Sequence, residues 1–148
     1  MRQVPKHELG QVLMMAVRDF QRRLDEDLAE RGVQGIRTGH RKVFMQLASD
    51  GTSRSADLAA KIGVRPQSMM KTVHELEQLA LVSRAPDPTD SRAKLIRLTR
   101  KGQALIRELS RSTETVWDQY AEMLGEHDLQ QAMQILSKLS AIAVREVA

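Results

Sequence analysis

The chain has 148 residues and no cysteine, so it is the size of one ordinary domain, and disulfides, thiolate metal sites and cysteine nucleophiles are excluded. Aromatic residues make up only 3% of the chain, which favours helices over a large sheet. The net charge is +4, yet residues 37–101 alone carry 13 basic and 6 acidic side chains, a balance that fits either a polyanionic partner or the solvated faces of helices.

The first 50 residues are predicted to form two helices. Apolar residues at three- and four-residue steps indicate one long amphipathic helix over Glu8–Arg31, which ends at Gly32. A second helix is expected from Thr38, its cap, to about Ser49, followed by a turn at residues 50–51.

Two shorter helices are predicted next, on either side of Gly63. The first follows a cap at Ser53 or Ser55, and its small Ala59 lets the two helices cross closely. The second begins at Pro66, because proline is tolerated in a first helical turn. This spacing is typical of a helix-turn-helix, although many helical hairpins share it. The inward stripe of the second helix is expected to consist of Met69, Val73, Leu76 and Leu79.

A β hairpin is predicted directly after the second of these helices. Residues 85–91 contain two prolines and several turn formers, which makes them the tip, and Lys94–Leu98 is the return strand. A hairpin beside a recognition helix is a wing that can reach a neighbouring minor groove, where arginine suits the narrow, electronegative surface. A plain solvated turn, in which Asp90 pairs with Arg92 or Lys94, is the alternative.

The helical period resumes from about Thr99 to Leu124, and Gly125 separates this stretch from a last helix. The apolar faces of the first and last helices exceed what one small lobe could cover, which favours a homodimer. The expected fold class is therefore mainly α. It is a winged helix-turn-helix with a small β hairpin wing at residues 36–99, and a dimerisation region formed by residues 1–35 and 100–148.

Residues 57–102 resemble the winged helix-turn-helix of the MarR family of bacterial regulators. The most specific part is the wing signature, in which Asp90, Arg92 and Lys94 precede Leu98-Thr99 and Lys101-Gly102. The resemblance implies a two-fold dimer with its recognition helices in successive major grooves. It also implies a small aromatic or amphipathic effector that loosens DNA contact. Family members usually have glycine where Ala80 stands, so a tighter or strained exit from the recognition helix is expected.

The resemblance also implies the DNA-binding residues. Gln67, Ser68, Lys71 and His74 would face the major groove, Arg65 would lie near a phosphate, Arg92 would enter the minor groove, Asp90 would brace the wing, and Arg84 and Lys94 would meet the DNA backbone.

The helical spacing gives a similar surface and adds Met70, which can touch a thymine methyl. For each of these residues the alternative is an ordinary solvent-exposed side chain. Met70 and His74 stand where more polar residues are expected, so the sequence does not indicate a base preference.

Other chemistries find little support. The four histidines, His7, His40, His74 and His127, are far apart and have no second ligand at helical spacing, so no metal site is expected. There is no nucleophile elbow and no phosphate-binding glycine loop, so neither an enzyme nor a bound cofactor is expected.

The sequence gives little information on an effector or on the location of the protein. Met14, Met15 and Met45 line either a ligand pocket or simply the core, and no motif identifies an effector. The longest apolar run, residues 12–17, is too short for a membrane span or a signal peptide, so a cytoplasmic protein without membrane contact is expected.

The sequence therefore predicts a dimeric, sequence-specific double-stranded DNA-binding transcription regulator, a repressor released by a small-molecule effector. Its operator would be a pseudo-palindrome with half-sites about one helical turn apart. One alternative is a winged-helix adaptor that binds another protein without binding DNA, and another is a small-molecule-binding or catalytic helical protein.

Overall fold

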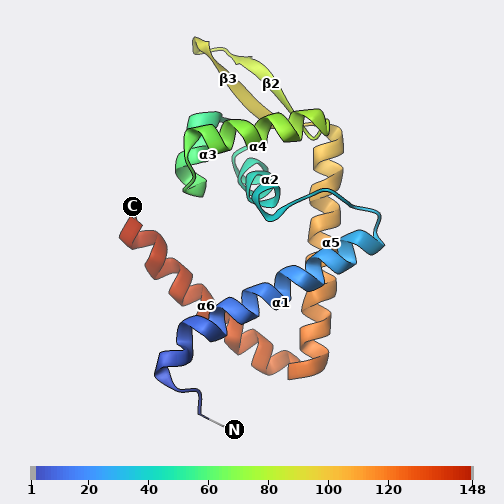
Figure 1. Ribbon diagram of the computed structural model, residues 1–148, viewed down its shortest axis with the longest axis vertical. Helices are drawn as coiled ribbons and strands as arrows, with labels where there is room; N and C mark the ends of the chain where they lie inside the picture. The colour runs from blue at the N-terminus through green and yellow to red at the C-terminus, as the bar shows by residue number, and fades with distance from the viewer. Residues whose placement is uncertain (1–2, 148) are drawn as a thin grey trace. The chain divides into compact units, whose positions relative to one another are not determined.

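The computed structural model describes residues 3–147, with side chains up to residue 143 (Figure 1). No helix among the described residues is both long and apolar enough to cross a membrane. In chain order the elements are η1 Lys6–Glu8, α1 Leu9–Glu30, α2 Thr38–Asp50, β1 Thr52–Arg54, α3 Ser55–Ile62, α4 Pro66–Gln78, β2 Val82–Asp87, β3 Asp90–Leu98, α5 Arg100–Leu124 and α6 Glu126–Val147.

The chain divides into two compact units. One comprises residues 28–110, and the other joins the residues up to Asp27 with those from Arg111. The first of these units is larger than the expected DNA-binding region of residues 36–99. The difference arises because Leu28 and Leu105 are buried within it and Arg31 pairs with Glu108 at 3.7 Å.

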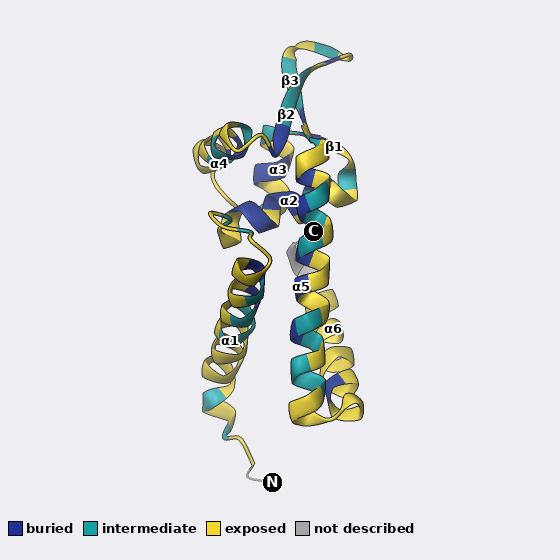
Figure 2. Cartoon of the chain, turned by 90° about the vertical axis from the view of Figure 1, so that its right-hand side faces the viewer, coloured by how far each residue is buried: buried dark blue, intermediate teal, exposed yellow. Residues whose placement is uncertain are grey.

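In the unit of residues 28–110, α2, α3 and α4 share one core with an antiparallel sheet of strand order β1-β3-β2. Figure 2 shows the buried residues of this unit on the facing sides of these helices. Leu79 was expected to point inward, and this is wrong: it caps the C-terminus of α4 and is 37% exposed. The rest of the expected stripe is confirmed, and the most completely buried side chains include Phe44, Leu47, Leu58, Met69, Val73, Leu76 and Ile96.

The sheet has a third strand that the sequence pattern did not reveal. Thr52–Arg54 forms β1, which pairs antiparallel with β3 in the register Ser53↔Ile96. Arg54 is consequently the N-cap of α3, in place of the expected Ser53 or Ser55. A three-residue strand is too short to show alternation, and it forms because the second edge of β3 is available for pairing. The cap of α2 also differs by one residue, since Arg37 rather than Thr38 occupies it.

The exit from α4 is strained, as expected for alanine at position 80. Ala80 has a φ of +58°, and it is the one non-glycine residue with positive φ among those described. Two residues hold this exit, one just before α5 and one in its first turn: Thr99 Oγ1 donates to the Ala80 carbonyl at 2.7 Å, and Lys101 Nζ donates to the Leu79 carbonyl at 2.9 Å. A Cβ on Gly102 would lie 2.2 Å from the Leu81 carbonyl oxygen, so only glycine fits there.

In the other unit, a polar cluster joins α1 to α5. Arg23 Nε and the Tyr120 hydroxyl both donate to Asp19 Oδ2, at 2.7 and 2.8 Å. Arg23 also donates to Gln119 Oε1 at 3.0 Å. The Arg23 hydrogen bond, followed by those from Arg22 and Tyr120, holds the pKa of Asp19 far below its usual value. The cluster therefore fixes one face of α1 against α5.

The apolar faces of this unit, by contrast, are exposed to solvent in the single chain. Figure 2 shows α1 and α6 as largely exposed along their length. Leu129 is a buried exception on α6. The exposed large apolar side chains of this unit include Leu9, Val12, Leu13, Met14, Met15, Val17, Met123, Leu124, Met133, Ile135, Leu136, Leu139 and Ile142.

Candidate nucleic-acid interface

Helix α4 presents the polar face that the sequence predicts. With Met69, Val73 and Leu76 buried, helical geometry places the candidate contact residues on the outer side. In the part of the chain that the structure describes, Lys71 and His74 have side chains with no hydrogen bond or ion pair. The exposed candidates on and just before this helix are Arg65, Gln67, Ser68, Met70, Lys71 and His74.

Met70 is less free than its neighbours on this face. It is 46% exposed, and its sulfur accepts a weak hydrogen bond from Ser55 Oγ at 3.3 Å. Ser55 is the first residue of α3, so this contact helps to set the position of α4 on the preceding helix. Nearly half of Met70 remains accessible, so the side chain can still make an apolar contact.

A buried histidine on α2 forms a hydrogen bond with α4. His40 Nδ1 accepts a hydrogen bond from the Arg37 backbone at 3.1 Å, so the neutral ring carries its proton on Nε2 and donates it to Glu75 Oε2 at 2.8 Å. Arg37 also pairs with the same carboxylate. The His40 hydrogen bond, followed by the Arg37 charge, lowers the pKa of Glu75. Sequence reasoning considered His40 only as a metal ligand and missed this role.

The wing carries its arginine in an interrupted stretch of the hairpin. Pro86 pairs with Lys94 and Asp87 with Asp90, so residues 91–93 have no partner in register on β2. Arg92 is exposed, and its guanidinium has no partner within the described range. Its backbone N–H donates to Asp90 Oδ1 at 3.0 Å. Figure 1 shows the hairpin extending away from α3 and α4 of the same unit.

A second carboxylate, Asp87, lies at the base of the wing tip and was missed from the sequence. Its side chain is only 5% exposed. Asp87 Oδ1 accepts hydrogen bonds from the Thr89 backbone and hydroxyl at 2.8 and 2.7 Å, and Oδ2 accepts one from Arg54 Nε at 2.7 Å. The Thr89 hydroxyl, the Thr89 amide and Arg54 together lower the pKa of Asp87 to about 2. The order Asp-Pro-Thr is a turn signal that could have indicated Asp87.

Arg84 is more enclosed than a simple phosphate contact requires. Its side chain is 24% exposed, and its Nε lies 3.0 Å from Glu77 Oε1 on α4. The pair links β2 to α4, and Glu77 offsets the charge of Arg84. Lys94, by contrast, is exposed and has no ion-pair partner among the residues with described side chains.

On α4 and the wing, the carboxylates are therefore paired, whereas several cations are not. Glu75, Glu77, Asp87 and Asp90 all lie within ion-pair distance of a cation of this unit. The cations named above as unpartnered face solvent instead. Such a surface attracts a polyanion more strongly than its formal charge indicates.

The remaining candidate sites gain little from the structure. Met14, Met15 and Met45 are 55%, 59% and 62% exposed, so none of them belongs to the core of its own unit. Among the residues that can be described, no group of three or more His, Asp or Glu side chains is placed to hold a metal ion.

Comparison with known proteins supports the winged helix-turn-helix directly. Residues 35–93 match the model of the MarR family. The chain is similar to wild-type MarR from E. coli, with a TM-score of 0.76 and 20% identity over 94% of this chain and 98% of that one. It is similar to the transcriptional regulator PA4135, with a TM-score of 0.72 and 26% identity over 95% and 98% of the two chains.

Two further solved structures of this fold contain a ligand. One is a mutant MarR from E. coli complexed with operator DNA, with a TM-score of 0.73 and 20% identity over 88% of this chain and 92% of that one. The other is NadR in complex with 4-hydroxyphenylacetate, with a TM-score of 0.65 and 23% identity over 94% and 97% of the two chains. The family match thus covers the winged helix-turn-helix, and the fold of these transcriptional regulators extends along nearly the whole chain.

Proposed function

We propose that this protein is a homodimeric, sequence-specific regulator of transcription that binds duplex DNA. The proposal is carried by one observation: the carboxylates of α4 and the wing are paired, whereas the cations Lys71, Arg92 and Lys94 are exposed to solvent. The operator complex of the mutant MarR supports it, because that protein has the same fold.

In the proposed complex, α4 enters the major groove and the wing reaches the adjacent minor groove. Gln67 can pair with adenine, and Lys71 with guanine or phosphate. Arg92 enters the minor groove, where its planar cation suits the negative potential. Arg65 and Lys94 neutralise phosphates and fix the orientation of the protein on the duplex.

Dimerisation is proposed from the open apolar faces of α1 and α6. A monomer that left this many large apolar side chains in water would expose an unusually large contiguous patch. A two-fold dimer would cover them and would match a pseudo-palindromic operator with half-sites about one helical turn apart.

Regulation is proposed to be repression that a small aromatic or amphipathic molecule relieves. The complex of NadR with 4-hydroxyphenylacetate supports this, because that protein also has this fold. The exposed methionines Met14 and Met15 on α1 offer adaptable apolar surface for such a molecule.

The test is duplex binding by fluorescence anisotropy, with an operator first selected from random DNA. We expect the logarithm of affinity to fall linearly with the logarithm of salt concentration, by about 0.9 for each phosphate neutralised. A scrambled duplex of the same length is the control and should bind at least about a thousandfold more weakly. If neither duplex binds with a salt-dependent affinity, the proposal fails, and binding of another protein becomes the better explanation.

A further inference from the structure

We propose that Arg54 is a positioning residue for DNA binding, which fixes the wing tip relative to the helix-turn-helix without itself contacting nucleic acid. The proposal rests on the function proposed above. It concerns a residue outside the wing and outside the recognition helix, which neither the hairpin pattern nor the helical spacing indicates.

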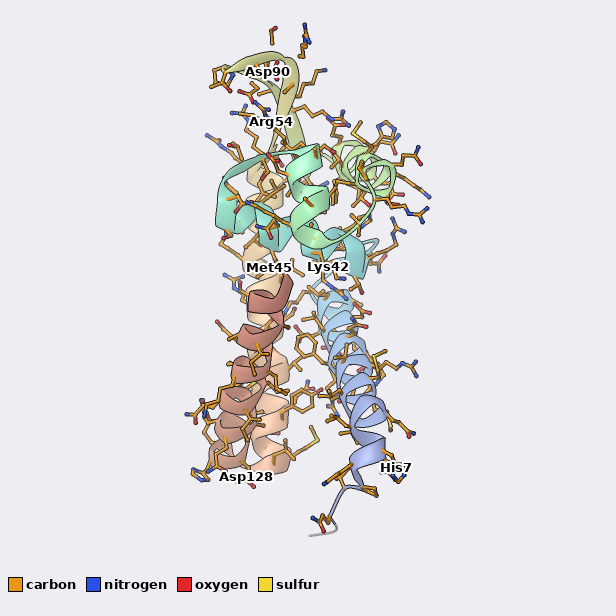
Figure 3. All side chains as sticks on the ribbon, turned by 90° about the vertical axis from the view of Figure 1, so that its left-hand side faces the viewer. His7, Lys42, Met45, Arg54, Asp90 and Asp128 are labelled. Atoms are coloured by element: carbon orange, nitrogen blue, oxygen red, sulfur yellow. The ribbon has the colours of Figure 1, made fainter. Side chains whose placement is uncertain are left out.

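All three nitrogens of the Arg54 guanidinium face residues of the wing tip. Nε donates to Asp87 Oδ2 at 2.7 Å, one terminal nitrogen pairs with the same oxygen and donates to Thr89 Oγ1 at 3.4 Å, and the other lies 3.9 Å from Asp90 Oδ2. Figure 3 shows Arg54 below Asp90 at the hairpin. Arg54 therefore joins the start of α3 to both carboxylates of the tip.

The sheet itself does not support the tip. The strand β1 pairs with β3 only over residues 95–97, so the hairpin beyond Leu95 is a two-stranded ribbon. Such ribbons are marginally stable in water. The register of this one is also interrupted between Pro86 and Asp87. The Arg54 side chain begins where β1 ends and extends the support of the third strand to the part of the hairpin that carries Arg92.

Losing Arg54 would have two consequences at the tip. The nearly buried Asp87 carboxylate would lose its cation and would draw water or a rearranged turn toward it. Asp90 would also lose its partner from outside the wing, although it would still accept the Arg92 N–H. Because Arg54 is already matched by these carboxylates, it contributes little free charge toward a phosphate. We therefore expect the loss of Arg54 to weaken binding by disordering the wing tip rather than by removing a charge from the interface.

The test compares Arg54→Ala with Arg97→Ala in the full chain. Arg97 is a matched control, because it is an exposed arginine of the same sheet whose Nε donates to Ser83 Oγ at 3.3 Å, away from the tip. We expect Arg54→Ala to weaken operator binding about tenfold with an unchanged salt slope, whereas loss of a true phosphate contact lowers that slope by about one. Arg97→Ala should leave affinity within about twofold.

A double-mutant cycle with Asp87→Asn separates positioning from direct contact. If Arg54 acts through Asp87, most of the affinity loss caused by Arg54→Ala should disappear in the Asp87→Asn background. A loss of the same size in both backgrounds, accompanied by a lower salt slope, would overturn the proposal and make Arg54 a DNA contact. Arg54→Lys keeps the charge but not the fork, so it should fall between wild type and Arg54→Ala.

Hydrogen exchange in the free protein tests the same device without DNA. The Thr89 amide donates to Asp87, so its exchange should become about tenfold faster in Arg54→Ala and stay unchanged in Arg97→Ala. If the wild-type protein binds no duplex but this difference is found, the proposed function fails while the positioning of the tip stands. Equal exchange in all variants would refute the positioning itself.

Discussion

At the scale of single residues, the interface is defined by which charges have partners. Glu77 and Asp87 are each paired with an arginine that lies on another element, Arg84 and Arg54 respectively. Among the residues with described side chains, Arg92 has a partner only for its backbone N–H, which donates to the Asp90 carboxylate. Its guanidinium therefore needs no internal bond to be broken before it meets a groove, and its loss should cost the folded protein almost nothing.

Replacing Arg92 with alanine is accordingly expected to weaken operator binding by about 1–3 kcal/mol and to leave the Tm within about one degree of wild type. Anisotropy titration and a thermal melt measure the two quantities. Arg92→Lys is the control: it should keep most of the salt slope but lose part of the affinity, because lysine lacks the planar fork. Undiminished affinity of Arg92→Ala at fixed salt would contradict insertion of the wing.

At the scale of elements, α4 depends on contacts made by residues remote from it in sequence. His40 on α2 forms a hydrogen bond with the carboxylate of Glu75 on α4. Thr99 and Lys101 bond the carbonyls at its C-terminus. The helix is thus held at several points while its outer side stays exposed to solvent. The strained point in this arrangement is Ala80.

Ala80→Gly should raise the free energy of unfolding by about 0.5–1 kcal/mol. A left-handed backbone costs alanine about 1–2 kcal/mol, and the greater freedom of glycine in the unfolded chain takes back part of that gain. Urea denaturation followed by circular dichroism measures the change. Gly63→Ala is the control in the reverse direction. Gly63 has a φ of +79° and an added Cβ would meet no neighbour there, so the substitution should lower stability by a similar amount through backbone strain alone. An Ala80→Gly variant less stable than wild type would show that position 80 is not strained.

Sequence periodicity was sufficient for the helices and for the outward face of α4, because burial of Met69, Val73 and Leu76 fixes which side faces solvent. It failed at β1, whose three residues pair with a strand far along the chain. The Arg54–Asp87 and His40–Glu75 pairs were likewise out of reach. Each joins residues more than thirty positions apart, and only the folded arrangement brings them together.

At the scale of the whole molecule, the apolar faces of α1 and α6 are the largest feature that one copy of the chain leaves unexplained. Ile135 and Leu139 on α6 are 60% and 50% exposed. Residues of this type cost about 1.5–3 kcal/mol each when they are left in water rather than buried. Covering both faces in a dimer would recover that free energy and would place two recognition helices on one operator.

The double variant Ile135→Glu/Leu139→Glu is therefore expected to sediment as a monomer at concentrations where wild type is a dimer. It should also bind a full operator more weakly, because one half-site is lost. Gln134→Glu introduces the same kind of charge at a polar, exposed position of α6 and should change neither result. A double variant that remained dimeric would place the subunit interface elsewhere.

Under the proposed function, the junction between α4 and α5 limits how this protein can acquire a new target sequence. The carbonyls of Leu79, Ala80 and Leu81 are each held by Thr99 or Lys101, and Gly102 leaves no space for a shift beneath Leu81. A change in the angle of α4 would break these hydrogen bonds. A new preference for a DNA sequence should therefore evolve by exchange of outward side chains such as Gln67 and His74, while the angle of the helix stays the same.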